Sequence, residues 1–204
     1  WLLNGEVQDF AGGAAIHINA GIAALVVVAV IGARRGHGTE AMPPHNLPQT
    51  VLGTGILWFG CFGFNAGSAL AADGTAVQAL VNTHLAAAAG MLGWLVVEKF
   101  KAGHATTLGA CSGAVAGLVA ITPWAGFVGD YSPVLICLLA GGGCYLALQV
   151  KELLRLDDSL DVIAVHLVGG LIGTLAVGLF GDSAINGRDG LFYGGGIDLF
   201  VDQL

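Results

Sequence analysis

Charged side chains are scarce in this chain: Asp, Glu, Lys and Arg together account for 10% of its 204 residues. A soluble domain of ordinary composition carries roughly a quarter charged residues. Hydrophobic residues make up 55% of the sequence, and its mean hydropathy is +0.80. These values argue against an ordinary water-soluble domain. We expect an all-α, polytopic helical bundle whose main solvent is a lipid bilayer.

Basic residues are the scarcer of the two charge signs. Lys and Arg total seven, the formal net charge is −7, and the only adjacent basic pair is Arg34 and Arg35. A nucleic-acid surface requires a basic patch or stripe. The sequence offers no such patch, so we expect no nucleic acid among the partners.

Signs of a cofactor, a metal centre or an active site are also missing. No CxxC pair occurs, and the cysteines lie in apolar segments, which predicts buried thiols: Cys61, Cys111, Cys137 and Cys144. The Gly-x-Gly pattern in LGTGILWFG follows no strand signal, so no dinucleotide site is expected there. Four histidines belong to no HxxxH or nucleophile motif: His37, His45, His84 and His104. We expect no cofactor, no bound metal and no enzyme activity.

Glycine, by contrast, is abundant, with 34 residues. Small residues let transmembrane helices approach closely where lipid supplies no hydrophobic drive for packing. The glycine content therefore predicts tight helix packing.

Six apolar runs have the length of membrane spans, because a hydrocarbon core of about 30 Å needs about 20 residues per helix. Polar or Pro/Gly-rich breaks separate them. We place the spans near residues 11–33, 48–70, 76–98, 106–126, 132–152 and 161–180.

The basic residues give these spans an orientation. Six of the seven follow the first, third or fifth span: Arg34, Arg35, Lys99, Lys101, Lys151 and Arg155. Cytoplasmic loops are enriched in Lys and Arg. We therefore expect these three loops inside the cell, with the start of the chain and the segment after residue 180 outside.

The two ends of the chain predict that it is a piece of a larger membrane protein. It opens on Trp1 without a signal-peptide pattern. The final stretch, GLFYGGGIDLFVDQL, begins like another apolar segment but contains Asp198 and Asp202.

Two histidines, His17 and His166, lie inside apolar runs of small residues. An ionisable side chain at membrane depth is costly and usually marks a pathway, a proton relay or a binding site. Their surroundings, HINAGIAAL and HLVGGLIGTL, are alike, with Asp9 eight residues before the first histidine and Asp161 five before the second. The alternating topology makes these two copies antiparallel, as in inverted repeats whose binding sites lie near the membrane midplane.

Depth arithmetic leaves the pairing of these histidines open. A rise of 1.5 Å per residue places the two rings roughly 10 Å and 7 Å from opposite membrane faces, which leaves an axial gap of roughly 13 Å. Contact requires helices that start deeper than the expected bounds, or a locally thin membrane. The alternative is two core histidines, each satisfied by a backbone carbonyl.

Five segments resemble, in order, segments of the ammonium transporter (Amt) family: DFAGGAAIHINAGIAALVVVAVIGARRG, PPHNLP, FGFNAGSA, LGACSGAVAGLVAITP and DVIAVHLVGGLIG. Rhesus-type relatives share the twin histidines but generally lack the DFAGG and PHNLP wording, which favours the Amt branch. The resemblance implies an eleven-helix fold with inverted repeats, assembled as a homotrimer with one pore per subunit in the plasma (inner) membrane. This chain would supply roughly the fifth to tenth helices.

The resemblance also implies roles for single residues. His17 and His166 correspond to the twin histidines of the pore, hydrogen-bonded to each other. Phe64 corresponds to one of two stacked phenylalanines that close the outer end of the pore. Ser68 corresponds to the hydroxyl that accepts a hydrogen bond from ammonium in the outer vestibule, beside a family tryptophan expected upstream of Trp1.

Two aspartates complete the expected site. Asp9 resembles the family aspartate near the recruitment site, although a carboxylate at the mouth of a helix equally caps free N–H groups. Asp161 is expected to be its symmetry counterpart, with the same structural alternative.

The implied function is ammonium transport: the vestibule recruits NH4+, which loses its proton so that NH3 crosses an apolar pore, with or without proton co-movement. Methylammonium is the expected analogue, and a PII-type regulatory protein is expected to bind through a C-terminal tail that lies beyond this chain. Two alternatives stay open. One is an ammonium sensor with a transporter-like domain, and the other is a Rhesus-like neutral gas channel.

Overall fold

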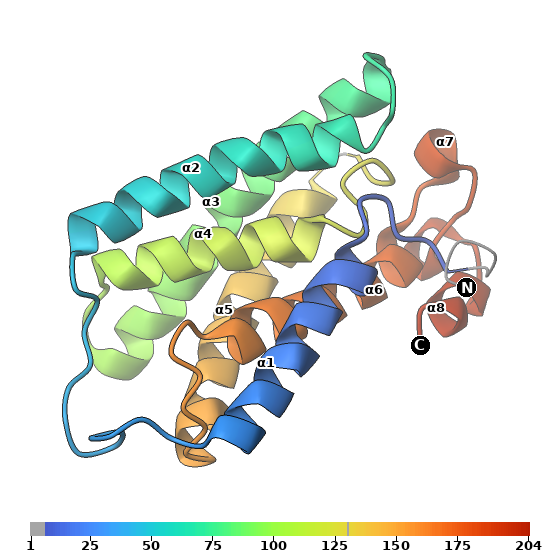
Figure 1. Cartoon of the computed structure of the whole chain (residues 1–204). Helices are drawn as coiled ribbons and strands as arrows, with labels where there is room; N and C mark the ends of the chain where they lie inside the picture. Colours follow the sequence, from blue (N-terminus) through green and yellow to red (C-terminus); the bar gives the residue numbers. More distant parts are fainter. Residues whose placement is uncertain (1–6, 130) are drawn as a thin grey trace.

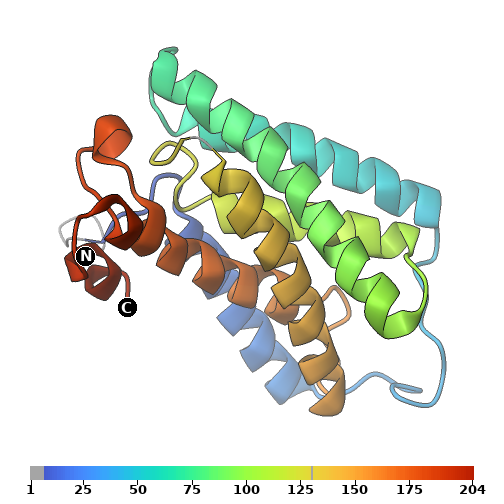
Figure 2. The same cartoon turned by 180° about the vertical axis from the view of Figure 1, so that it is seen from behind.

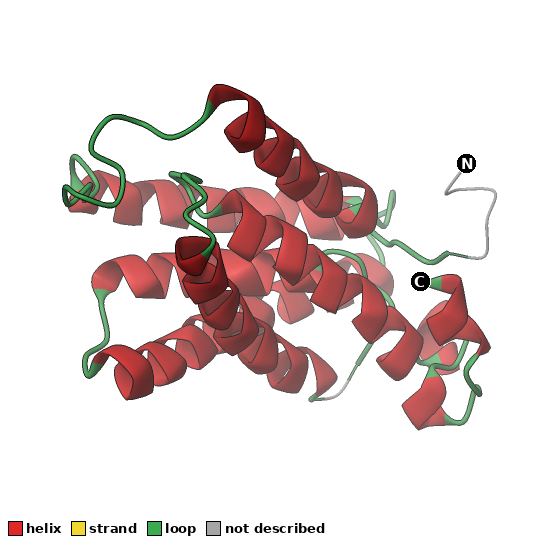
Figure 3. Cartoon of the chain, turned by 90° about the horizontal axis from the view of Figure 1, so that it is seen from below, coloured by secondary structure: helices red, strands yellow, loops and turns green. Residues whose placement is uncertain are grey.

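The computed structural model describes residues 7–129 and 131–204, and every regular element in these ranges is a helix (Figures 1 and 3). The long segments are η2 (Ala14–Ile18), α1 (Asn19–Ile31), α2 (Leu47–Gly67), α3 (Gly74–Ala102), α4 (Thr107–Ile121), α5 (Ser132–Leu153), η3 (Ile163–Leu167) and α6 (Val168–Phe180). Three short helices follow: α7 (Ser183–Asn186), η4 (Leu191–Tyr193) and α8 (Asp198–Asp202). The expected all-α bundle is confirmed.

Each of the six expected residue ranges overlaps one apolar helical segment of the described chain. Five of these are long and apolar enough to cross a membrane: Ala14–Ile31, Leu47–Gly67, Gly74–Ala102, Ser132–Leu153 and Ile163–Phe180. The two segments that contain His17 and His166 each begin with a π-helix, η2 or η3, which continues directly into α1 or α6.

The sixth segment, α4, is shorter than the span expected near residues 106–126. Its 15 residues extend about 22 Å at 1.5 Å per residue, less than the hydrocarbon thickness of about 30 Å. The helix ends at Ile121, and the chain continues in turns. Pro123 explains this end, because a proline has no N–H with which to extend the helical hydrogen bonds.

The long helices alternate in direction, and the basic loops share one end of the bundle. α1, α3 and α5 end there, whereas α2, α4 and η3 begin there (Figures 1 and 2). Arg34, Lys99, Lys101, Lys151 and Arg155 lie in or just beyond the last turns of the first three. We refer to this end of the bundle as the inner end and to the opposite end as the outer end.

The glycine surplus serves close packing around α3, which contacts α2, α4 and α5. A Cβ atom at Gly90 of α3 would lie 2.6 Å from the carbonyl oxygen of Gly113 in α4, and one at Gly141 of α5 would overlap the carbonyl oxygen of Gly90. Helix backbones touch directly where lipid gives no hydrophobic drive for association. The expected tight helix packing is therefore present.

Polar residues mark where the loops end and the helices begin. The side chains of Asn46, Asp73 and Thr106 each accept a hydrogen bond from the backbone N–H three residues later, at the starts of α2, α3 and α4. Such N-caps satisfy donors that have no partner within the helix. The PPHNLP segment thus acts as the start signal of α2, with Asn46 as its cap.

Candidate functional site

His17 and His166 both lie in π-helical turns. Each is the fourth of five residues, in η2 and η3 respectively. Two residues before each turn the backbone takes a positive φ, at Gly12 (79°) and at Asp161 (58°). π-turns are rare in proteins as a whole, but those that occur are often found at functional sites. The hydrophobic pattern of the sequence carries no signal for them.

The two imidazole rings meet. Nδ1 of His166 lies 3.2 Å from Nδ1 of His17, and the ring centroids are 5.3 Å apart with a tilt of 41°. The rings are in contact although the expected spans implied an axial gap between them; the helical segments begin at Ala14 and Ile163, a few residues after the expected starts near 11 and 161.

Two glycines let the segments that contain the histidines cross at close range. Gly21 lies four residues after His17, and a Cβ there would lie 2.7 Å from the backbone N and Cα of Leu167. Gly170 lies four residues after His166, and a Cβ there would lie 3.2 Å from Cβ of His17 and 3.3 Å from the backbone N of Ile18. The contacts are related by the repeat, because Ile18 and Leu167 each follow their histidine directly.

A third polar side chain, Thr122, joins the pair. Its Oγ1 lies 3.3 Å from Nε2 of His17, and the same oxygen donates a hydrogen bond of 2.7 Å to the carbonyl of Leu118. The residue is 1% exposed. Thr122 was not predicted as a site residue; the signal for it in the sequence is Pro123, which follows it and ends α4 inside an apolar run.

The loop before η2 is hydrogen-bonded to the turn that follows α4. The backbone N–H groups of Phe10 and Ala11 donate to the carbonyls of Pro123 and Thr122, at 2.8 Å and 3.3 Å. Non-helical backbone at membrane depth is tolerated only where protein groups satisfy it. Because α4 ends at Ile121, the turn that follows it provides the hydrogen-bond partners of this loop.

Asp9 makes the capping contact weighed in the sequence analysis. Its Oδ2 accepts a hydrogen bond from the N–H of Ala15 at 3.1 Å, in the first turn of η2. Burial raises the pKa of this carboxyl group above its ordinary value, and hydrogen bonds from the backbone of residues 13–15 oppose that shift. A role for Asp9 in ammonium recruitment stays a prediction.

The symmetry counterpart of Asp9 is Asp158, and the expectation of Asp161 is wrong. Asp158 lies eight residues before His166, the same spacing that separates Asp9 from His17. Its Oδ2 accepts a hydrogen bond of 2.7 Å from the N–H of Ile163, at the start of η3. Asp161 forms an ion pair with Lys151. The sequence comparison matched the nearest aspartate, whereas the repeat preserves the spacing to the histidine.

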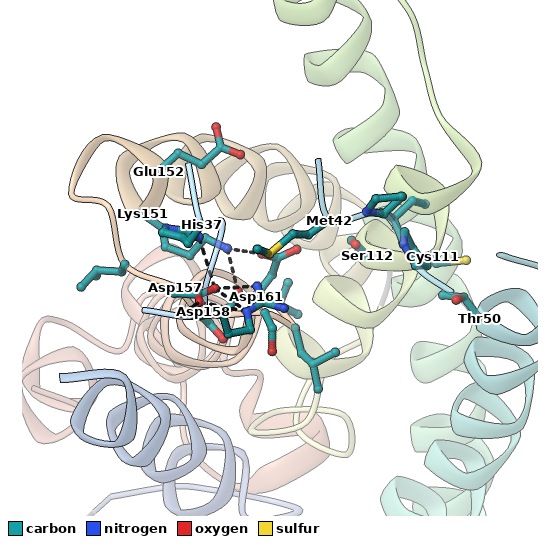
Figure 4. Close-up of a pocket in the computed structure, with 18 of the residues that line it drawn as sticks. His37, Met42, Thr50, Cys111, Ser112, Lys151, Glu152, Asp157, Asp158 and Asp161 are labelled. Atoms are coloured by element: carbon teal, nitrogen blue, oxygen red, sulfur yellow. Dashed lines mark hydrogen bonds and ion pairs between the residues drawn. The ribbon is translucent and has the colours of Figure 1, made fainter. Parts of the chain in front are cut away.

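A cavity of about 1190 Å³ opens at the inner end of the bundle. Its lining includes His166 and seven charged residues: Arg34, Lys151, Glu152, Arg155, Asp157, Asp158 and Asp161. Figure 4 shows Lys151 and the three aspartates gathered on one side, with Ser112 and Cys111 of α4 on the other. The cavity thus connects the histidine pair with the inner charged loops.

Arg34 and Asp157 clamp the loop after α1 to the loop before η3. Asp157 accepts hydrogen bonds from the Arg34 backbone N–H at 2.6 Å and from Nε and an NH2 group of its guanidinium. Nδ1 of His37 lies 3.3 Å from the same carboxylate, whose side chain is 2% exposed. The Arg34 guanidinium holds the pKa of Asp157 well below its ordinary range.

Replacing Asp157 by Asn is expected to lower the apparent melting temperature of the full-length protein by a few degrees at pH 7, because Arg34 loses its ionic acceptor. The unfolded pKa of an aspartate is about 3.9, and the folded pKa of Asp157 is lower. Stabilisation by the pair is therefore full above the unfolded pKa and is lost as pH falls towards the folded pKa. The difference between wild type and variant should narrow below about pH 4.

Glu152→Gln is the matched control, because Glu152 is an exposed carboxylate near the same inner end. Thermal melts of the wild type and both variants in detergent at pH 7 and pH 3 test the clamp. An Asp157→Asn melting temperature equal to that of the wild type at pH 7 would contradict it.

The residues expected at the vestibule lie at the outer end of α2. Phe64 is 43% exposed, and no other described aromatic ring stacks on it. Ser68 donates its hydroxyl hydrogen to the Phe64 carbonyl at 2.8 Å, so its oxygen is left to act as an acceptor. Trp1 lies outside the described residues.

His84 of α3 is separate from the histidine pair. Its ring packs against Trp58 and Phe62 of α2, with centroid separations of 5.5 Å and 5.8 Å. His84 therefore takes part in the packing of α3 against α2.

Comparisons with known proteins agree with this architecture. Residues 1–204 match the Ammonium Transporter Family. The chain is 53% identical over 204 residues to an ammonium transporter of Mycobacterium tuberculosis, with 96% of this chain and 43% of that protein covered. The crystal structure of Candida albicans Mep2 is similar with a TM-score of 0.90 and 39% identity, covering 100% of this chain and 47% of that chain.

A solved structure described as a Sensor Amt Protein is also similar, with a TM-score of 0.85 and 31% identity, covering 100% of this chain and 51% of that chain. The chain thus spans about half the length of the relatives it matches.

Proposed function

Because the chain belongs to the ammonium transporter family, we propose that it forms part of a pore that moves ammonium across the plasma membrane. The chain is an integral, multi-pass membrane protein, and its described residues include five helices long and apolar enough to cross a bilayer. The resemblance to the Amt family is confirmed, as is the expected all-α bundle that covers about half of the family fold.

The observation that carries the proposal is the contact between Nδ1 of His17 and Nδ1 of His166 inside apolar helices. Ionisable side chains at membrane depth are usually retained for a pathway or a binding site. Here two such side chains lie against each other, and one of them also lines the inner cavity. We propose that the pair supplies the polar contacts in an otherwise apolar pore.

The chemistry of this pore distinguishes ammonium from potassium. The two ions have similar size and charge, so a cavity that measured radius alone would separate them poorly. A narrow apolar channel makes any bare ion very unfavourable. Ammonium sheds a proton and continues as neutral NH3, whereas potassium has no proton to lose.

Recruitment is proposed at the outer end of the bundle. The Ser68 oxygen has acceptor capacity left after donating to Phe64, and an ammonium N–H is a suitable donor for it. An aromatic face attracts a cation, which suits the exposed ring of Phe64 as part of a vestibule and gate. The buried carboxyl of Asp9 lies at the mouth of η2 and contributes negative charge when it is ionised.

The assembly and its regulation are part of the same proposal. We propose a homotrimer with one pore per subunit, and a regulatory protein of the PII class that docks on the cytoplasmic face. The grouping of Lys and Arg at the ends of α1, α3 and α5 supports this face as the cytoplasmic one.

A second candidate is an ammonium sensor built on the same domain. The similarity to the solved structure described as a Sensor Amt Protein favours keeping it. A signalling domain in the same polypeptide, read from its full-length gene, together with an absence of ammonium flux would support the sensor.

An ammonium jump applied to the full-length protein in liposomes tests the proposal. We expect a current, and an internal pH change, that potassium at equal concentration does not produce. A current shows that charge crosses the membrane, either as intact NH4+ or as a proton that accompanies NH3. Internal alkalinisation without current shows conduction of NH3 alone, as expected of a Rhesus-like gas channel. If neither signal appears, the transport proposal is wrong and the sensor is favoured.

A further inference from the structure

The Thr122 hydroxyl lies within hydrogen-bond distance of only one of the two histidines, His17. It has a single hydrogen to donate, and the two contact distances indicate which partner receives it. The shorter of its two contacts runs to the Leu118 carbonyl at 2.7 Å, and the longer to Nε2 of His17 at 3.3 Å. A carbonyl oxygen only accepts, so the Thr122 hydroxyl donates to Leu118. Its oxygen is then left as an acceptor for the N–H of His17.

This contact sets the hydrogen positions along the whole pair. A neutral imidazole carries one hydrogen, on either Nδ1 or Nε2. If Nε2 of His17 donates to Thr122, Nδ1 of His17 has no hydrogen and accepts. The hydrogen in the 3.2 Å contact between the rings must then belong to Nδ1 of His166. Nε2 of His166 consequently carries no hydrogen.

We propose that Thr122 is a positioning residue that fixes the tautomers of His17 and His166 and thereby gives the pair one donor direction. The direction runs from His166 Nδ1 to His17 Nδ1, and from His17 Nε2 to Thr122. The tautomers follow from the geometry alone. Their consequence for transport rests on the proposed function: the bare Nε2 of His166 is the acceptor that an N–H of the substrate meets.

The symmetry of the repeats explains why such a residue matters. The two histidines lie in equivalent π-turns and face equivalent glycines, so the pair alone gives no reason to prefer one donor direction over the other. Among the described residues, Thr122 is bonded to His17 and no equivalent hydroxyl is bonded to His166. For the opposite donor direction, the Thr122 hydroxyl would have to donate to Nε2 of His17 instead of to the Leu118 carbonyl. The buried Leu118 carbonyl would then lose its hydrogen bond from Thr122.

Ring nitrogen chemical shifts of ¹⁵N-histidine test the proposal, because they distinguish Nδ1–H from Nε2–H. The full-length protein is measured in liposomes as wild type, Thr122→Val and Thr122→Ser. We expect one set of signals in the wild type, with His17 protonated on Nε2 and His166 on Nδ1. The valine variant keeps the shape of the side chain but removes the acceptor, so we expect both tautomer arrangements. The serine variant restores the hydroxyl and should restore the single set.

Thr174→Val is the matched control. Thr174 is another buried threonine, on α6 itself, and its Oγ1 has no hydrogen-bond partner among the described residues. Its removal should leave the histidine signals unchanged. Ammonium flux should fall severalfold in Thr122→Val and recover in Thr122→Ser.

The proposal is overturned if wild-type His17 carries its hydrogen on Nδ1, or if Thr122→Val keeps the single wild-type set of signals. The wild-type spectrum decides the first point even if the valine variant does not fold. The two proposals fail separately. A protein with the expected tautomers but no ammonium flux contradicts only the transport function, whereas normal flux with the opposite tautomers contradicts only the role of Thr122.

Discussion

Replacing His166 by alanine is expected to reduce ammonium flux through the full-length protein by at least about tenfold, which corresponds to about 1.4 kcal/mol in the barrier. The substitution removes the ring whose Nδ1 lies 3.2 Å from Nδ1 of His17. His17 is then left with a partly buried nitrogen that has lost its partner, and the pore loses the residue that also lines the inner cavity. Hydrogen bonds in a polar network strengthen one another, so the loss of one member weakens the others as well.

His84→Ala is the matched control for this experiment. His84 is also a histidine at membrane depth, but it packs between aromatic rings of α2 and takes no part in the pair. Current and internal pH are recorded after an ammonium jump and after a potassium jump. If His166→Ala, intact and correctly assembled, shows wild-type flux and wild-type selectivity, the assigned role of the pair is wrong.

Replacing Gly21 by alanine should destabilise the protein by about 1–3 kcal/mol, the usual range for overpacking, and should also impair transport. The added methyl group would lie 2.7 Å from the backbone of Leu167. Backbone atoms cannot move aside as a flexible side chain can, so the two crossing segments must separate. Because His17 lies one turn before Gly21 and His166 directly precedes Leu167, their hydrogen bond is expected to lengthen or break.

The apparent melting temperature and the ammonium flux of Gly21→Ala are compared with those of Gly74→Ala. Gly74 begins α3, and apart from its chain neighbours and its own helix backbone no described atom lies within 4 Å of a Cβ built there. We expect both quantities to fall for Gly21→Ala and neither to fall for the control. An unchanged flux in Gly21→Ala would show that the close crossing is not needed to hold the pair.

Much of the fold was predictable because the solvent imposes simple rules. Long apolar runs predicted the helical segments, and the position of Lys and Arg after alternate spans predicted which helix ends lie together. The repeat was visible in the likeness of the two segments that contain His17 and His166. These signals depend on composition and on order along the chain, both of which a single sequence contains.

The geometry of the site was less predictable because it depends on where helices begin and end in space. α4 ends at Ile121, two residues before a proline, and the loop before η2 forms its hydrogen bonds with the turn that follows. Assuming full-length spans led to an axial gap that the structure does not have. Thr122 became part of the site for the same reason. Asp158 was missed because the nearer Asp161 is the same residue type.

The π-turns of η2 and η3 make the site sensitive to chain length. A π-helical turn holds more residues than the α-helical turn that it replaces. Deleting one residue within Ala14–Ile18 would favour a regular helix, in which the two sides of the deletion are rotated by about 100° relative to each other. The histidine and the loop before it then could not both reach their partners. In these two stretches a substitution leaves the register of the pair unchanged, whereas an insertion or deletion shifts it.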